Sequence, residues 1–368
     1  MAVGDVINGY KLTTEWKVVG GMSEIAFAQK GGKDWFIKKF IYPKYPTSDS
    51  PGSPRVKEQK RKICVEFENR QKALNGKIGA KCGLGGNLIY AYDFFRCDTC
   101  YYKVNEKIDV DSIAISNISH LTKKELLIIM KSLVHSLRIL HKEGIVHGDL
   151  KPDNILIKKS VTGNYTTKLI DFDDSYFSGS PAEDKESVVG TPEYYSPELY
   201  TYISDEDGEV SGKTLTLQSD IFALGIIFTE YITGEKPIIS EEYPATYSAV
   251  MDGASICFKP SSNLSPTLDR LLQDMMQKEP DKRPTIDEVF NRLKEEPEVG
   301  SKESEVPTDV SKSVPDLHSS PKVGLRGRGL GLTSSIKSVP EKSVEKSAPT
   351  TPPASKLKGK GLDIAKKS

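Results

Sequence analysis

The sequence predicts an α+β protein with a small β-rich region over about residues 1–105 and a larger, mostly helical region over about residues 108–296. Short apolar runs bounded by turn residues fill the first region, as expected of strands. Apolar residues three or four positions apart dominate the second region, as expected of packed helices. The remaining residues, 297–368, are rich in Ser, Pro, Gly and Lys and predict a disordered tail, because such a composition cannot bury enough apolar surface.

The first region contains four candidate strands and one candidate helix. Each candidate strand is rich in β-branched or aromatic residues. The strands are expected at Ile25–Ala28, Trp35–Phe40, Leu88–Tyr92 and Tyr101–Val104, and the helix at about Val56–Leu74. Within this region Cys97 and Cys100 form a lone Cys-x-x-Cys, which we interpret as a hairpin turn rather than a metal site, because zinc requires four ligands.

The second region contains four candidate helices. The clearest covers residues 123–142, where Thr122 and Glu125 fit a capping box and Gly144 is a suitable stop. Three further helices are expected at about Asp220–Thr233, from Ser265-Pro266 onward, and from Thr285 onward, and a hairpin is expected at residues 154–157 and 167–170.

Composition gives few arguments for unusual partners. The 368 residues are 37% hydrophobic and carry no formal net charge, with 51 basic and 51 acidic side chains. No apolar run is long enough to span a bilayer, and five cysteines, an odd number, fit a reducing compartment. We therefore expect a cytoplasmic protein without a membrane span.

The balance of charge hides a basic end. Residues 322–368 hold 11 Lys and Arg against 3 Asp and Glu, a difference of +8. The segment contains no aromatic side chain for base stacking, which argues against a nucleic-acid partner. We expect a tether that carries phosphorylation sites and binds an unidentified partner.

The stretch His147–Asn154, followed by Ile170–Asp173, carries the chemistry. Asp149 can accept a hydroxyl proton, and Lys151 can neutralise charge on a transferred phosphoryl group. Asn154 and Asp171 offer the hard oxygen ligands that Mg²⁺ prefers. This combination predicts phosphoryl transfer.

Several ordered motifs resemble those of a eukaryotic-type Ser/Thr protein kinase domain over about residues 10–296. They are Asp149-x-Lys151-x-x-Asn154, Asp171-Phe172-Asp173, Gly190-Thr191-Pro192-Glu193 through Ser196-Pro197-Glu198, Asp220-x-Phe222-x-Leu224-Gly225, and Arg283 as partner of Glu198. The resemblance implies a bilobal protein-kinase-like fold, with an N-lobe over about residues 1–105 and a C-lobe over about 108–296. It implies ATP and Mg²⁺ as cofactors and Ser/Thr proteins as substrates. We also expect the kinase to phosphorylate itself, with serines of the tail as candidate sites. The His-Gly-Asp variant resembles bacterial kinases of this type more than animal ones.

The resemblance also implies the nucleotide site. Lys38 corresponds to the strand lysine that holds the α- and β-phosphates. Gly20 and Gly21 lie in an irregular glycine loop, and their backbone N–H groups are expected to contact phosphate. Ile25 and Leu156 are expected to enclose the adenine, and the backbone of Glu106 and Ile108 to bind its edge. Phe36 replaces a small alanine and could crowd the base.

The helix glutamate that pairs with the strand lysine is open to more than one alignment. Glu66 fits best, Glu68 is the second choice, and another register places Arg70 at that position.

Two departures concern regulation. Gly148 replaces the arginine that usually binds an activation-loop phosphate, and Asp173 replaces the glycine of Asp-Phe-Gly. We interpret Asp173 and Asp174 as loop acids more readily than as metal ligands.

Two alternatives to an active protein kinase follow from these residues. The irregular glycine loop and Phe36 leave open a pseudokinase or scaffold module. His147-Gly148-Asp149 is also typical of small-molecule phosphotransferases, although enzymes resembling aminoglycoside kinases lack the segment from Gly190 to Glu198.

Overall fold

The computed structural model describes residues 1–19, 23–81, 86–108, 113–160, 163–182 and 190–298. The chain divides into two units, Met1–Ser304 and Glu305–Ser368. Beyond residue 298 the predicted disordered tail lies outside the described residues, so the tail and the limits of the predicted domains stay predictions.

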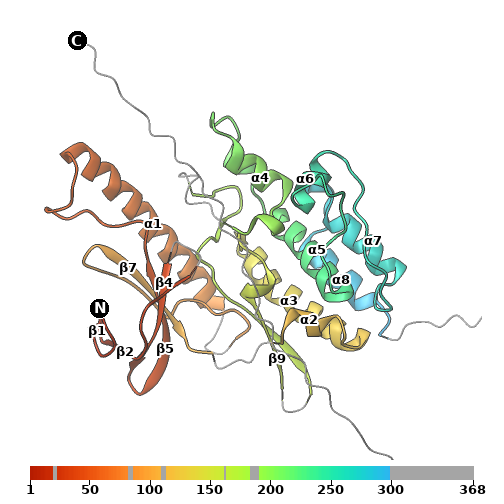
Figure 1. Ribbon diagram of the computed structural model, residues 1–368, viewed down its shortest axis with the longest axis horizontal. Coiled ribbons are helices and arrows are strands. Elements are labelled where there is room, and N and C mark those ends of the chain that lie inside the picture. Colours follow the sequence, from red (N-terminus) through yellow and green to blue (C-terminus); the bar gives the residue numbers. More distant parts are fainter. Residues whose placement is uncertain (20–22, 82–85, 109–112, 161–162, 183–189, 299–368) are drawn as a thin grey trace, which may run out of the picture. The chain divides into compact units, whose positions relative to one another are not determined.

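A seven-stranded sheet forms the N-lobe, together with one long helix (Figure 1). All its neighbouring strands are antiparallel, in the order β1-β2-β4-β5-β7-β6, with β3 paired to β4. The strands are β1 (Val6–Ile7), β2 (Tyr10–Leu12), β3 (Lys17–Val19), β4 (Ser23–Lys30), β5 (Lys33–Phe40), β6 (Asp93–Cys97) and β7 (Cys100–Glu106).

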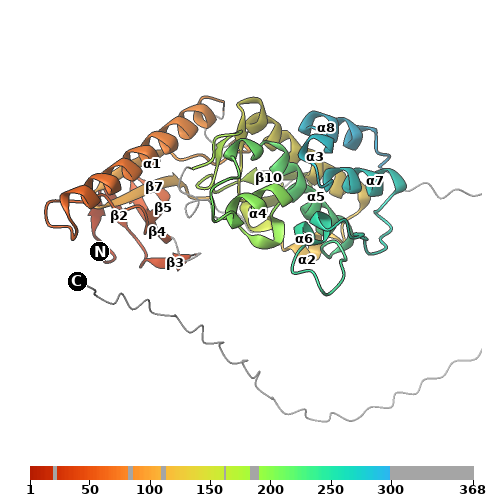
Figure 2. The ribbon, with the colours of Figure 1, turned by 90° about the horizontal axis from the view of Figure 1, so that it is seen from above.

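Helix α1 (Pro54–Lys81) lies beside this sheet, as Figures 1 and 2 show. Its inner face packs in two places. Cys64 forms a small buried cluster with Phe40 of β5 and Tyr101 of β7, whereas Leu74 and Ile78 belong to the main core. The helix is longer than the predicted segment at both ends. It is tied to the sheet at one end and to the C-lobe core at the other.

The C-lobe is mostly helical and is built around α5 (Gln218–Thr233), of which fifteen residues are buried. The apolar face of α3 (Lys123–Lys142) packs into the same core. The other elements are α2 (Ile115–Ile118), β8 (Ile145–Val146), β9 (Ile155–Lys159), β10 (Tyr165–Leu169), β11 (Tyr176–Phe177), α4 (Pro197–Ser204), α6 (Thr246–Met251), α7 (Pro266–Met275) and α8 (Ile286–Glu295).

The four predicted C-lobe helices and the predicted hairpin are confirmed. Thr122 and Glu125 form the capping box of α3, and Thr285 and Glu288 form that of α8. Gly234 ends α5 with a φ of 83°, a conformation that costs glycine little.

Two expectations for the N-lobe strands were wrong or incomplete. The segment from Leu88 to Tyr92 is not a strand, because it contributes only a single bridge between Leu88 and Leu169. The hairpin of β1 and β2 was not predicted. Its turn is Asn8-Gly9, with φ values of 49° and 83°, a two-residue turn that favours this pair of residues.

Candidate active site

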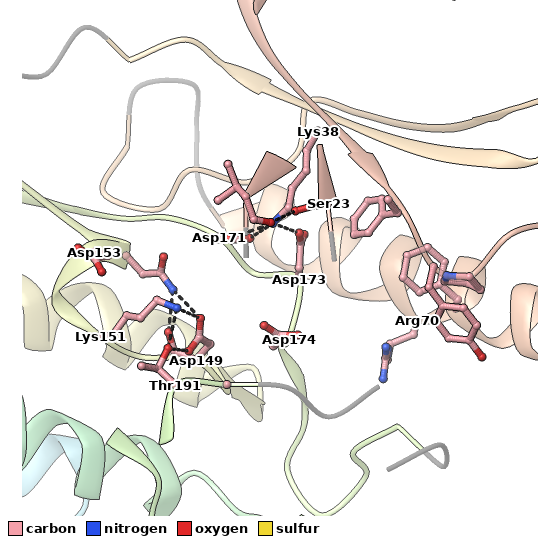
Figure 3. Close-up of a pocket in the computed structure, with 17 residues that line it drawn as sticks. Ser23, Lys38, Arg70, Asp149, Lys151, Asp153, Asp171, Asp173, Asp174 and Thr191 are labelled. Carbon is pink, nitrogen blue, oxygen red and sulfur yellow. Dashed lines mark hydrogen bonds and ion pairs between the residues drawn. The ribbon is translucent and has the colours of Figure 1, made fainter. Parts of the chain in front are cut away.

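The predicted catalytic residues lie together on the loop between β8 and β9. The Lys151 Nζ atom is 2.6 Å from Asp149 Oδ2 and 2.7 Å from Thr191 Oγ1. The Thr191 hydroxyl in turn donates to Asp149 Oδ1 at 3.0 Å. Asp149 and Lys151 therefore form a triangle with a residue of the activation segment (Figure 3). The contact to Thr191 was not predicted, although the motif in which Thr191 lies was identified from the sequence.

Asn154 fixes the catalytic loop from its far end. Its Nδ2 atom donates to the Asp149 carbonyl at 2.8 Å and to Asp149 Oδ2 at 3.1 Å. The side chain is buried, and the short turn Pro152–Asn154 leads directly into β9. Because the amide nitrogen makes both bonds, the amide oxygen of Asn154 is the atom left to serve as a metal ligand.

A buried carboxylate on α5 holds the backbone of the same loop. Asp220 accepts hydrogen bonds from the backbone N–H groups of His147, at 2.8 Å, and Gly148, at 3.3 Å. His141 of α3 lies 3.0 Å from the same carboxylate. The loop is therefore anchored to the two central helices, and of these anchoring residues only Asp220 lies in a motif identified from the sequence.

The structure explains why residue 148 is a glycine, which the sequence alone did not. Its φ is 85°, and a Cβ atom at this position would lie 2.3 Å from the backbone oxygen of Asp174. Real Cβ atoms do not approach a backbone oxygen so closely. The loop of Asp149 and the loop of Asp174 therefore pack backbone against backbone at this point, and a side chain would separate them.

Asp171 and Lys38 meet between the lobes. Asp171 has a φ of 61°, a left-handed conformation that is uncommon outside glycine and is found at functional sites. Lys38 Nζ lies 3.0 Å from both carboxylate oxygens of Asp171 and 2.5 Å from Asp173 Oδ2. Burial alone would lower the pKa of Lys38, but the two carboxylates outweigh it and raise the pKa above its ordinary value. Lys38 is therefore charged.

The expectation that Glu66 pairs with Lys38 was wrong. Glu66 is exposed on the outer side of α1, beside Arg61 and Lys62. Glu68, the second choice, accepts a hydrogen bond from the Tyr101 hydroxyl at 2.8 Å. Successive helical residues are turned by about 100°, so a helix that presents Phe67 to the cavity turns both glutamates away from it.

A cavity of about 250 Å³ corresponds to the predicted adenine site. It brings together the predicted residues Ile25, Glu106, Ile108, Leu156 and Lys38, as part of a lining that is mostly apolar. The predicted contacts of Gly20 and Gly21 lie outside the described residues.

Phe36 lines the adenine cavity, as its position on β5 requires. Its ring packs edge-on against Phe27, with 6.0 Å between the ring centres. Asn105, paired with Phe36 across the sheet, donates its side-chain amide to the Ile89 carbonyl. Phe36 therefore forms one wall of the cavity rather than filling it.

A second, larger cavity of about 580 Å³ joins the lysine site to the catalytic loop (Figure 3). Asp149, Asn154 and Asp171 all line it, together with Lys38 and Lys151. Two lysines and three oxygen-bearing side chains on one cavity suit a phosphate chain with a hard divalent cation. The residues present therefore fit Mg²⁺ and ATP, although among the described residues no cluster of three or more His, Cys, Asp and Glu side chains could hold a metal by itself.

Asp174 adds an acid to this cavity. Burial raises its pKa to about 8, and the nearby charges of Asp173, Asp149 and Asp171 act in the same direction. The Asp174 carboxyl therefore holds its proton more strongly than an exposed aspartate does.

The predicted ion pair behind the activation segment is present. Arg283 is fully buried and binds both carboxylate oxygens of Glu198, at 2.7 and 2.8 Å. It also donates to backbone carbonyls of Gln218 and Gln277. Ser219 donates to Glu198 from the start of α5. The activation segment is thereby tied to the central helix.

Comparison with known families gives the same assignment. The protein kinase domain family matches residues 58–293, more than half of the chain. The chain belongs to the protein kinase domain family. The match begins within α1, includes the β6–β7 hairpin and ends within α8, and both the bilobal fold and the predicted motifs agree with it.

Curated relatives specify the serine/threonine branch. The kinase domain is 28% identical over 182 residues to serine/threonine-protein kinase PknB of Mycolicibacterium smegmatis, which covers 47% of this chain and 27% of the relative. It is 25% identical over 245 residues to serine/threonine-protein kinase MST20 of Pyricularia oryzae, covering 66% and 25%. It is 28% identical over 224 residues to inactive serine/threonine-protein kinase PLK5 of Mus musculus, covering 59% and 35%. The matched region thus spans about a quarter to a third of these relatives' own length.

The matched region is thus a protein kinase domain of the serine/threonine type. None of the helices in the described ranges combines the length and the apolar character needed to cross a membrane. The cytoplasmic location stays a prediction.

Proposed function

We propose that this kinase domain is catalytically active and transfers the γ-phosphoryl group of ATP to Ser and Thr hydroxyls of proteins, including its own. The observation that carries the proposal is the hydrogen-bonded triangle of Asp149, Lys151 and Thr191 in the lining of a cavity that Lys38 and Asp171 also line. Every side chain that phosphoryl transfer needs from the chain lines the same space.

Asp149 is proposed to orient the substrate hydroxyl and to accept its proton. Its carboxylate is held by Lys151, Thr191 and Asn154, so it keeps one orientation without help from substrate. Such preorganisation lowers the barrier because no reorganisation is needed during reaction. Lys151 is proposed to move its Nζ atom from Asp149 to the transferred phosphoryl group, where the ammonium charge would neutralise the developing negative charge.

Asn154 and Asp171 would hold Mg²⁺, and Lys38 would hold the α- and β-phosphates. Bound Mg-ATP supplies the phosphoryl group and an electrophilic cation. The apolar walls contributed by Ile25, Leu156 and Phe36 would exclude water from the base. Backbone groups of Glu106 and Ile108 would bind its polar edge.

An inactive scaffold is the second candidate. It is favoured by Phe36 in the wall of the adenine cavity, and a relative named as inactive shares 28% identity. The complete set of Asp149, Lys151, Asn154, Asp171 and Lys38 supports activity instead. The substrate and the partner of the tail are not specified by any of these residues.

The test compares the full chain with Asp149→Asn, which keeps the shape of the side chain and removes the acceptor charge. We expect wild type to label Ser and Thr residues from ATP and Mg²⁺, and the variant to lose about 10²–10⁴-fold in rate. Asp287→Asn, which alters an exposed acid paired with Arg138 on the C-lobe surface, serves as the matched control and should keep wild-type activity.

Mass spectrometry of the labelled protein then locates any autophosphorylation. Nucleotide binding is followed separately by the shift of the melting temperature with ATP and Mg²⁺, because a ligand that binds the folded state raises it. Binding without transfer to a panel of proteins, or no binding at all, would favour the scaffold.

A further inference from the structure

Lys38 has an acidic partner, but that partner does not come from α1. Its Nζ atom lies 2.5 Å from Asp173 Oδ2, closer than to either oxygen of Asp171. In the family pattern a helix glutamate does this, and residue 173 is a glycine. Here residue 173, two positions after Asp171, is an aspartate and supplies the carboxylate that pairs with Lys38.

The Asp173 carboxylate is buried and is contacted by two lysines. Its second oxygen, Oδ1, accepts a hydrogen bond from Lys103 of β7 at 2.6 Å. The side chains of Lys38, Lys103 and Asp173 are 15%, 4% and 10% exposed. The ammonium groups of Lys38 and Lys103 lie against the two oxygens of this buried carboxylate, one on each. A charge this deep persists only when it is paired.

Helix α1 has meanwhile lost the acid that would compete for Lys38. Arg70, not a glutamate, extends from α1 toward the cavity that Lys38 lines (Figure 3). Glu66 is turned outward and is exposed. Leu74, one turn after Arg70, is buried in the main core, so the rotation of the helix is fixed. Of the three alignments considered from the sequence, the one that places Arg70 at the position of the helix glutamate agrees with the rotation of α1.

Helix α1 contacts the Asp173 loop through Gln71. Gln71 donates its side-chain amide to the backbone carbonyl of Asp173 at 3.3 Å. Gln71 itself is 1% exposed. The helix therefore contacts the backbone of the loop, whereas the charge that binds Lys38 belongs to the loop itself.

We propose that Asp173 is the positioning residue for Lys38, taking the part that a helix glutamate has in the family pattern. The loop that carries the metal ligand Asp171 then also sets the lysine that holds the phosphates. Correct placement of Lys38 depends on this loop and on β7 through Lys103, and not on a charge from α1. The inference rests on the proposed function, since it concerns how Lys38 is prepared for nucleotide.

The decisive test is a matched pair, Asp173→Asn and Glu66→Gln, in the full chain. Each replaces one carboxylate by an amide of the same shape, one at the observed partner and one at the partner expected from the sequence. Three quantities are measured: KM for ATP, kcat, and labelling of the Lys38 amine by an amine-reactive ester without nucleotide, read by mass spectrometry against an exposed lysine such as Lys124.

We expect Asp173→Asn to raise KM for ATP by about tenfold or more, which is a loss of about 1.4 kcal/mol in nucleotide binding, with a smaller change in kcat. Labelling of Lys38 should rise several-fold, because its amine has lost the nearer of its two carboxylate ion-pair partners. Glu66→Gln should leave all three within twofold of wild type. A purely structural role for Asp173 would lower melting temperature and kcat without this split.

The proposal is overturned if Asp173→Asn keeps wild-type KM and Lys38 labelling, or if Glu66→Gln reproduces the changes. Should Asp173→Asn fail to fold, Asp173→Gly, which restores the residue usual in the family, is read in its place, and the Glu66→Gln result decides independently. If wild type itself binds no nucleotide, the proposed function fails, but Lys38 labelling still decides whether Asp173 anchors the lysine.

Discussion

The catalytic loop of the C-lobe and the lysine site of the N-lobe reach the same cavity by different means. Around Asp149 the predicted motif residues Lys151 and Asn154 contact its carboxylate, and the loop is held by α5 through Asp220. Around Lys38 the expected helix partner is absent, and a loop carboxylate, Asp173, replaces it. One half of this site follows the family pattern, and the other half reaches an equivalent charge arrangement with different residues.

The difference shows that residues close together in the sequence are fixed by backbone geometry, whereas the element that supplies an acid to a lysine is less constrained. Asp149, Lys151 and Asn154 lie within six residues of one another, so backbone geometry fixes their relation. The acid beside Lys38 can come from any element that reaches the same point. A kinase domain can therefore move that acid from a helix to a loop more easily than it can rearrange the catalytic loop.

The strongest way to sharpen the comparison is Glu198→Gln in the conventional half. Arg283 is fully buried, and loss of the carboxylate leaves its charge without compensation. We expect the free energy of unfolding to fall by about 3–5 kcal/mol. Urea unfolding followed by circular dichroism measures it, with the exposed pair partner Asp287→Asn as control. Wild-type stability would mean that the ion pair is not a main support of the activation segment.

The corresponding change in the unconventional half is Lys103→Met, which keeps an unbranched side chain of similar length and removes one of the two cations on Asp173. The carboxylate retains Lys38, so the expected loss is smaller, about 2 kcal/mol in the free energy of unfolding. Urea unfolding measures it on the same scale as Glu198→Gln. If Lys103→Met were as stable as wild type, the buried charge cluster would not need its second cation, and the contrast between the halves would weaken.

The smallest effect is expected at the end of the kinase domain, far from the cavity. Glu296 binds Lys123 at 2.6 Å and accepts hydrogen bonds from the hydroxyls of Ser265 and Thr267. Burial alone would raise the pKa of Glu296, but these three partners lower it below its ordinary value. We expect Glu296→Gln to cost about 1–2 kcal/mol at pH 7.

The sign of its pH dependence follows from that lowered pKa. The ionised carboxylate stabilises the folded state above the ordinary glutamate pKa of about 4.3, and this contribution is lost as the pH falls through the lower folded-state value. Thermal unfolding at pH 7 and at about pH 3 should therefore show a difference between wild type and Glu296→Gln that largely disappears in acid. A difference that is the same at both values would assign the effect to packing.

Much of the C-lobe could be predicted because its signals are local. Thr122 with Glu125 and Thr285 with Glu288 are capping pairs three residues apart, and both helices begin where these pairs place them. The Asn8-Gly9 turn is an equally local signal, and reading it would have predicted the β1–β2 hairpin.

The partner of Lys38 could not be obtained in this way. Lys38 and Asp173 are separated by 135 positions in the sequence. To decide whether Asp173 or Glu66 pairs with Lys38, one must know how α1 is rotated about its axis. That rotation is set by the burial of Leu74 and Ile78 in the core, which the sequence pattern alone does not locate. Gly148 is similar, because its necessity comes from the approach of Asp174.

The packing at Gly148 also limits how this kinase could acquire new control. An arginine at this position is the family's usual receiver for a phosphate on the activation segment. Here its first side-chain carbon would meet the Asp174 oxygen at 2.3 Å, so no single exchange could install the receiver while the neighbouring loop stays where it is. Residues 173 and 174 would have to be remodelled first, at the expense of the acid that anchors Lys38. We therefore expect kinases with this arrangement to be regulated by means other than a phosphate bound at position 148. Installing such a phosphate site by protein engineering would require changes in both loops.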